Sequence, residues 1–106
     1  MALPLIAVVT TLNESHSAVV VDVSAKGAKL RGPILPGPGQ DLFLSIDGLV
    51  MFGVVVRQED DTRGIVFDEP LDANQEARLR QKLIQASGLP IEIRAAFDDW
   101  SAGFAR

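Results

Sequence analysis

Hydrophobic and polar residues alternate along the first two thirds of the chain with the two-residue period of a β-strand, and turn-forming residues interrupt this alternation at short intervals. Valine, isoleucine and leucine dominate the apolar positions, as is typical of strands that bury one face. The pattern predicts six short strands, over residues 5–12, 18–24, 28–31, 41–46, 49–57 and 63–68. Six short antiparallel segments joined by turns indicate an all-β fold, a six-stranded antiparallel barrel.

The residues between these strands favour chain reversal. Asp47-Gly48 is a strong signal for a two-residue hairpin. Residues 13–16 are expected to form a turn, and Gly27 is expected to supply a positive φ at another. Gly53 lies inside a strand, where it indicates a bulge or the sharp bend of a small closed barrel. Residues 32–39 hold three prolines and three glycines and are therefore expected to form a loop.

The period of the pattern changes to that of a helix after Pro70. Asp72 and Gln75 have the spacing of a capping box, and Gly88 is a typical stop signal, so a helix is predicted over residues 73–87. One face of that helix is apolar and is expected to pack on the barrel, while basic residues cover the rest. The apolar residues are Leu79, Leu83, Ile84 and Ala86, and the basic ones are Arg78, Arg80 and Lys82.

The last residues of the chain carry a second apolar pattern. Phe97, Trp100 and Phe104 follow one another at helical spacing, which favours a short helix. We therefore expect a barrel and packing helix over residues 1–88, followed by a tail over residues 89–106.

Composition limits the classes of function. A chain of 106 residues supports one domain, and 47% hydrophobic with 23% charged residues is ordinary for a globular protein. The formal net charge of -4 argues against a general nucleic-acid binder, which would need excess Lys and Arg. Neither a signal peptide nor a membrane span is evident, and Cys is absent, so a cytoplasmic location is expected.

Residues suited to catalysis or metal binding are few. His16 is the only histidine, and no Gly-x-Ser-x-Gly motif surrounds a serine. Adjacent acidic residues occur at 59–61, 68–69 and 98–99, where solvated turn carboxylates are the ordinary explanation. We therefore expect a binding protein rather than an enzyme, with no metal and no resident cofactor.

The most informative segment runs from Asp22 to Arg31. Strand alternation predicts that Asp22 and Ser24 share a face with Ala18 and Val20, whereas Val19, Val21 and Val23 face the core. Basic residues follow closely and form a local patch suited to a phosphate: Lys26, Lys29 and Arg31. The alternative is that Asp22 and Ser24 only close a turn and that the cations are simply solvated.

Asp22-x-Ser24-x-x-Gly27 resembles the Asp/Asn-x-Ser-x-x-Gly motif of the PilZ domain, the bacterial receptor family for cyclic di-GMP. The later segments at residues 53–57 and 64–71 and the helix over 73–87 are similar to those of the family in order and kind, so the resemblance spans residues 3–87. It implies a six-stranded antiparallel barrel with a C-terminal helix, in agreement with the periodicity. It also implies that Asp22, Ser24 and Gly27 hold a guanine base and the adjoining backbone of the dinucleotide.

The family also uses an Arg-x-x-x-Arg motif before the first strand, which grips the phosphates and stacks on guanine. No Lys or Arg precedes Lys26 in this chain. We therefore expect either that such arginines lie upstream of Met1 or that the ligand is bound weakly or not at all. Lys26, Lys29 and Arg31 compensate only in part, because planar guanidinium serves both phosphate and base.

The expected function is that of a cyclic di-GMP-responsive receptor or adaptor, which passes a signal to a protein partner through its surface. The alternative is a ligand-independent interaction module with the same fold. In that alternative, the stripe of Phe97, Trp100 and Phe104 docks a partner or a second copy, unless it serves to close the barrel.

Overall fold

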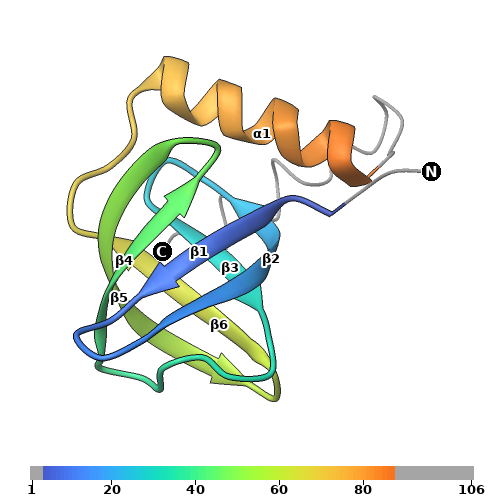
Figure 1. Cartoon of the computed structure of the whole chain (residues 1–106). Coiled ribbons are helices and arrows are strands. Elements are labelled where there is room, and N and C mark those ends of the chain that lie inside the picture. The colour runs from blue at the N-terminus through green and yellow to red at the C-terminus, as the bar shows by residue number, and fades with distance from the viewer. Residues whose placement is uncertain (1–3, 88–106) are drawn as a thin grey trace.

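Six antiparallel strands close into a barrel in the computed structural model, which describes residues 4–87 (Figure 1). The order around the barrel is β1-β2-β3-β6-β5-β4, and β4 pairs back with β1 to complete the closure. One helix follows the last strand. The elements are β1 (Ile6–Thr10), β2 (Ser15–Val23), β3 (Gly27–Arg31), β4 (Asp41–Ile46), β5 (Leu49–Glu59), β6 (Thr62–Phe67) and α1 (Ala73–Ser87). The predicted fold class is confirmed.

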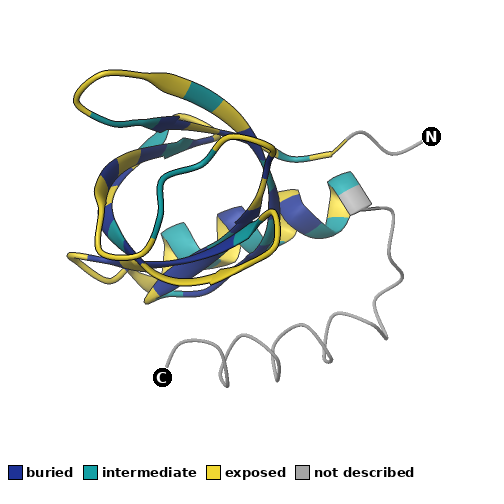
Figure 2. Cartoon of the chain, turned by 90° about the horizontal axis from the view of Figure 1, so that it is seen from below, coloured by how far each residue is buried: buried dark blue, intermediate teal, exposed yellow. Residues whose placement is uncertain are grey.

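The barrel interior is filled by aliphatic side chains that alternate along the strands with exposed or half-buried residues (Figure 2). Burial of this apolar surface is the main stabilising contribution, at roughly 25 cal/mol per Å². The largest fully buried apolar side chains are Leu30, Leu42, Leu44, Ile46, Ile65 and Leu79. Leu79 and Leu83 come from α1, so the helix completes the core at one end of the barrel (Figure 1).

Two local signals in the sequence, a helix cap and a hairpin turn, form in the structure as predicted. Asp72 Oδ1 accepts from the Gln75 backbone N–H at 2.7 Å, and Gln75 Oε1 accepts from the Asp72 N–H at 3.0 Å, which confirms the capping box. The Asp47-Gly48 hairpin is also confirmed, since both residues have the positive φ of a type I′ turn, 51° and 82°. Arg78 of the helix then binds this turn through the Asp47 carboxylate and carbonyl.

The residues of β2 that face the core differ from those predicted. Ala18 and Val20 are buried, whereas Val19 and Val21 are half-buried, so the predicted facing of residues 18–21 is wrong. The register between β2 and β3 shifts between Val20 and Asp22, and such a bulge moves later residues to the opposite face. Only beyond the bulge does the predicted facing hold, with Val23 buried.

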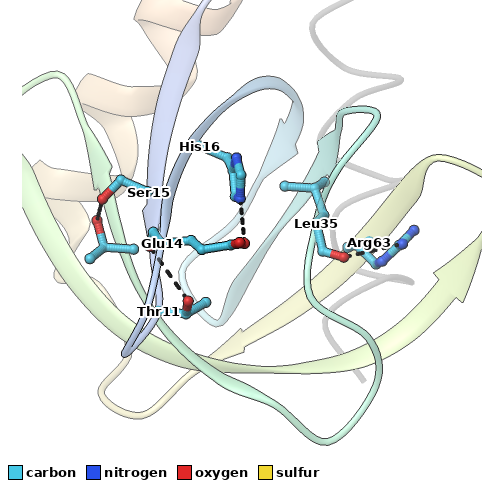
Figure 3. A network of polar contacts seen from close by, with 7 residues as sticks. Thr11, Glu14, Ser15, His16, Leu35 and Arg63 are labelled. Carbon is cyan, nitrogen blue, oxygen red and sulfur yellow. Dashed lines mark hydrogen bonds and ion pairs between the residues drawn. The ribbon is translucent and has the colours of Figure 1, made fainter.

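Two further expectations need correction. β2 begins at Ser15, so His16 lies in a strand rather than a turn, where its Nε2 lies 2.8 Å from Glu14 Oε2 (Figure 3). For Gly53 the alternative of a bulge is wrong, because the register irregularity in β5 lies between Val55 and Arg57; the alternative of a bend in the closed barrel stays a prediction. A Cβ at Gly53 would instead lie 2.6 Å from the Val66 carbonyl oxygen, so glycine is needed there for close packing. The tail over residues 89–106 and Gly88 lie outside the described residues.

Candidate functional site

The Asp-x-Ser-x-x-Gly segment forms the reversal between β2 and β3, at the end of the barrel that faces α1. The Ser24 backbone N–H donates to Gly27 O at 2.8 Å, and the Ser24 hydroxyl donates to the same oxygen at 3.4 Å. The Ser24 side chain is 4% exposed. Turn closure by Ser24 is therefore a feature of the structure, as the simpler interpretation of the motif expected.

The bulge in β2 places Asp22 on the outer side of the sheet. Asp22 lies directly opposite Lys29 in the register, and opposed residues project to the same side. Lys29 is flanked by the core residues Ala28 and Leu30, which identifies its side as the outer one. Asp22 is nevertheless only 1% exposed. Within residues 4–87 no buried side-chain nitrogen or oxygen lacks a hydrogen-bond partner, so this carboxylate is satisfied where it lies.

Backbone hydrogen bonds tie the hairpin to the segment that leads into the helix. Lys26 O accepts from the Phe67 N–H at 2.8 Å, and Ala25 O accepts from the Leu71 N–H at 2.7 Å. The hairpin thus shares its hydrogen bonds with β6 and with the start of the connection to α1. Movement of the motif therefore requires movement of that connection.

Glu76 of α1 provides a second link between the helix and the hairpin. Its Oε2 accepts from the Ala25 backbone N–H at 3.2 Å and also lies 3.1 Å from Arg80 Nη2. The Arg80 pair holds the carboxylate in place, because the two residues are one helical turn apart. The carboxylate therefore couples the motif directly to the helix.

Replacing Glu76 by alanine is expected to lower the free energy of unfolding by about 1 kcal/mol, because the Ala25 N–H loses a charged acceptor that is partly open to solvent. Urea denaturation measures the change. Glu69→Ala removes an exposed acid from the neighbouring connection and should stay within about 0.5 kcal/mol of the wild type. Equal stability of the two variants would contradict the proposed link between helix and hairpin.

Gly27 serves a different purpose from the one expected. Its φ is not in the positive range, so the prediction of a left-handed turn residue is wrong. A Cβ at this position would lie 2.2 Å from the Ile65 carbonyl oxygen of β6. Glycine is required because two backbones approach closely there, which sequence periodicity does not reveal.

The predicted cations lie along one side of the barrel. Lys26 and Arg31 are exposed and Lys29 is half-buried. The register adds a cation that the sequence reasoning did not include, since Lys29 lies opposite Gly64 and Gly64 lies opposite Arg57. Two strand spacings separate the backbones of Lys29 and Arg57, about 10 Å, with no side chain between them. Only the pairing of β3, β6 and β5 brings these residues into one row.

A scan against protein-family models matches the PilZ domain over residues 1–85, which is most of the 106-residue chain. The chain belongs to the PilZ domain family. No curated protein matches the chain. The PilZ family consists of receptor and adaptor domains that respond to cyclic di-GMP, and its members are binding modules rather than enzymes. The closed six-stranded barrel with one C-terminal helix agrees with this PilZ assignment.

Of the acidic groups considered from the sequence, the structure describes residues 59–61 and 68–69, whereas residues 98–99 lie outside the described part. Within residues 4–87 no three or more His, Asp or Glu side chains gather in a way that could hold a metal ion. The helix in this part of the chain is also too short and too polar to cross a membrane. The candidate functional site is the β2–β3 hairpin with its cations.

Proposed function

We propose that this PilZ domain is a cyclic di-GMP-responsive receptor or adaptor, located in the cytoplasm and without catalytic activity. The observation that carries the proposal is the Asp-x-Ser-x-x-Gly hairpin, set beside a row of basic residues in a protein of net charge -4. In this proposal the ligand lies against the outer side of β2, β3 and β6. A protein partner then recognises the change that ligand binding causes at the surface of the domain.

The chemistry of each group fits this ligand. A carboxylate such as Asp22 accepts hydrogen bonds from the N–H groups of guanine, and the Ser24 hydroxyl adds one more. Lys26, Lys29 and Arg31 supply charge for the two phosphates. Arg57, in the Lys29 row, adds a planar guanidinium, which is the group that both pairs with phosphate and stacks on a base. Arg57 thereby replaces part of what the arginine motif supplies in the family.

Because the polar groups of the motif are buried, ligand binding has an energetic cost. Asp22 and Ser24 are 1% and 4% exposed, and Glu76 occupies the Ala25 N–H. A ligand that contacts these groups must displace internal hydrogen bonds, which subtracts from its affinity. The same bonds tie the hairpin to α1, so their displacement transmits binding to the helix. We therefore expect modest affinity together with a structural response in α1.

Isothermal titration of cyclic di-GMP into the full chain tests the proposal. Saturable heat is expected for the wild type and its loss for the Asp22→Ala/Ser24→Ala double variant, because that variant removes both polar side chains. Lys26→Glu should weaken binding about tenfold or more, since it turns one phosphate partner into a repulsive charge.

Lys82→Glu is the matched control, because Lys82 is exposed on α1 and its replacement by glutamate changes the net charge by the same amount as Lys26→Glu. It should bind as the wild type does, and circular dichroism should show all variants folded. Absence of heat for a folded wild type at high ligand concentration would overturn the receptor proposal.

The second candidate is a ligand-independent interaction module. The observation that favours it is that the polar groups of the motif are already paired within the chain, Ser24 with Gly27 and Ala25 with Glu76. Such a hairpin needs no ligand to satisfy it. In this candidate the stripe of Phe97, Trp100 and Phe104 docks the partner, and a negative titration would favour it.

A further inference from the structure

The outer side of β1, β4 and β5 carries large apolar side chains that the core does not use. We call this surface the apolar face and define it by six residues that the barrel leaves exposed: Ile6, Val8, Leu12, Phe43, Val50 and Phe52. Val50 is 69% exposed and Phe43 53% exposed, and Leu12, after the end of β1, is 102% exposed. An antiparallel barrel exposed to water would normally place polar residues at such positions.

The strand register makes the apolar face continuous. Phe43 of β4 lies directly opposite Phe52 of β5, and their rings meet edge to face with centroids 5.0 Å apart. Ser45 lies between Val8 of β1 and Val50 of β5 in the next outward row. The aromatic pair thus sits beside the valine row on one surface.

The apolar face is large for a surface that is exposed to water. Each of its six residues is at least 40% exposed, whereas monomeric proteins rarely expose contiguous apolar patches larger than a few hundred Å². A standard interface buries about 800 Å² on each partner, of which somewhat more than half is apolar. The helix α1 lies across one end of the barrel and leaves this face uncovered (Figure 1).

A groove extends the face at the end of the barrel away from α1. It has a volume of about 750 Å³, and Phe43 and Phe52 are among the residues that line it. Leu12, Gln40 and Asp41 line it as well. The apolar face therefore continues into a hollow.

The charge pattern of the apolar face fits a second copy of the chain. The outward positions at the centre of the face are uncharged, and the carboxylates of Asp41 and Asp47 lie only at the ends of β4. In a two-fold dimer each patch meets its own copy, so a charged centre would oppose like charges. A molecule of net charge -4 can approach its own copy without such repulsion only through an uncharged face.

We propose that the apolar face binds a second copy of this chain, in a two-fold symmetric dimer with the valine row and the Phe43–Phe52 pair at its centre. The dimer buries the exposed aromatic and aliphatic side chains of both copies and leaves the β2–β3 hairpins outside the interface. Dimer formation through this face does not depend on ligand binding, so it is tested without cyclic di-GMP.

Sedimentation equilibrium of the full chain over about 1 to 500 µM is the first test. The wild type is expected to approach twice the 11.4 kDa of one chain as the concentration rises. Val50→Glu places a charge in each half of the interface and should weaken association by about a hundredfold or more. Ile34→Glu is the matched control, because Ile34 is an exposed apolar residue in the loop outside the face, and it should associate as the wild type does.

A cysteine cross-link tests the same surface without destabilising it. The chain has no Cys, so Ser45→Cys introduces a single thiol at the centre of the face and Ile34→Cys a single thiol outside it. Oxidation should convert Ser45→Cys to a disulfide-linked dimer and leave Ile34→Cys monomeric. A wild type that stays monomeric throughout, or equal responses of the Val50 and Ile34 variants, would overturn the proposal and leave the face to a different protein.

Discussion

Replacing Gly27 by alanine is expected to destabilise the domain by about 3 kcal/mol, a large part of the stability of a small domain. The added Cβ would lie 2.2 Å from the Ile65 carbonyl oxygen, and the two residues belong to the paired strands β3 and β6. Backbone in a closed barrel cannot move aside as a side chain tip can, so two strands must separate locally. Guanidinium chloride denaturation, read as the change in midpoint at constant slope, measures the loss.

Gly37→Ala provides the control for the Gly27 variant. A Cβ at Gly37 would meet only Gln58 Oε1 at 3.9 Å, and its φ is not positive, so alanine should be neutral or stabilising by about 0.5 kcal/mol. Equal stability of the two variants would contradict the close approach of β3 and β6. The result also affects how the motif is tested. If Gly27→Ala is destabilised, a loss of ligand binding in this variant would indicate damage to the fold and not the loss of a direct contact with the ligand.

Replacing Arg63 by methionine is expected to lower the free energy of unfolding by about 3 kcal/mol, because it leaves several backbone carbonyls without their charged donor. Arg63 is 9% exposed, and its guanidinium donates to the carbonyls of Pro36, Asp60 and Thr62 and, as Figure 3 shows, of Leu35. Methionine keeps the apolar part of the side chain, so the change isolates the polar contacts. Chemical denaturation measures the loss.

The Arg63→Met variant is expected to make the Pro/Gly loop more accessible to protease, in addition to lowering the free energy of unfolding. Because two of the four carbonyls belong to the Pro/Gly loop, the variant should be cut faster by thermolysin near Ile34 and Leu35. Arg31→Met is the matched control, since Arg31 is exposed at the end of β3, and it should change stability by less than about 0.5 kcal/mol. An Arg63 variant that resists denaturant and protease as well as the Arg31 variant would show that the loop does not depend on the guanidinium.

Arg63 explains how a loop with three prolines and three glycines can lie against a barrel. Prolines supply no backbone donor, so carbonyls in such a loop need donors from elsewhere. One buried guanidinium in β6 provides them to Leu35 and Pro36, and to the β5–β6 turn as well. Among the described residues, a charged side chain therefore holds the loop and the β5–β6 turn at the end of the barrel opposite α1.

Elements decided by neighbouring residues were predictable from the sequence. The period of two, the Asp47-Gly48 turn and the Asp72/Gln75 capping box each depend on a few residues close in the chain, and the structure confirms all three. The order of these elements was enough to indicate the barrel and the helix, and together with the Asp-x-Ser-x-x-Gly motif it indicated the resemblance to the PilZ family. Local preferences of this kind act before any tertiary contact is made.

Features decided by strands distant in the chain were not predictable in the same way. The bulge that turns Asp22 outward, the close approach that demands Gly27, and the Lys29–Gly64–Arg57 row all depend on which residues face one another across paired strands. The sequence by itself determined the existence of the strands, the Asp47-Gly48 turn, the helix cap and the residues of the motif. Only the tertiary structure decided which way the motif faces and which cations lie beside it, because a single bulge reverses the facing of every residue beyond it.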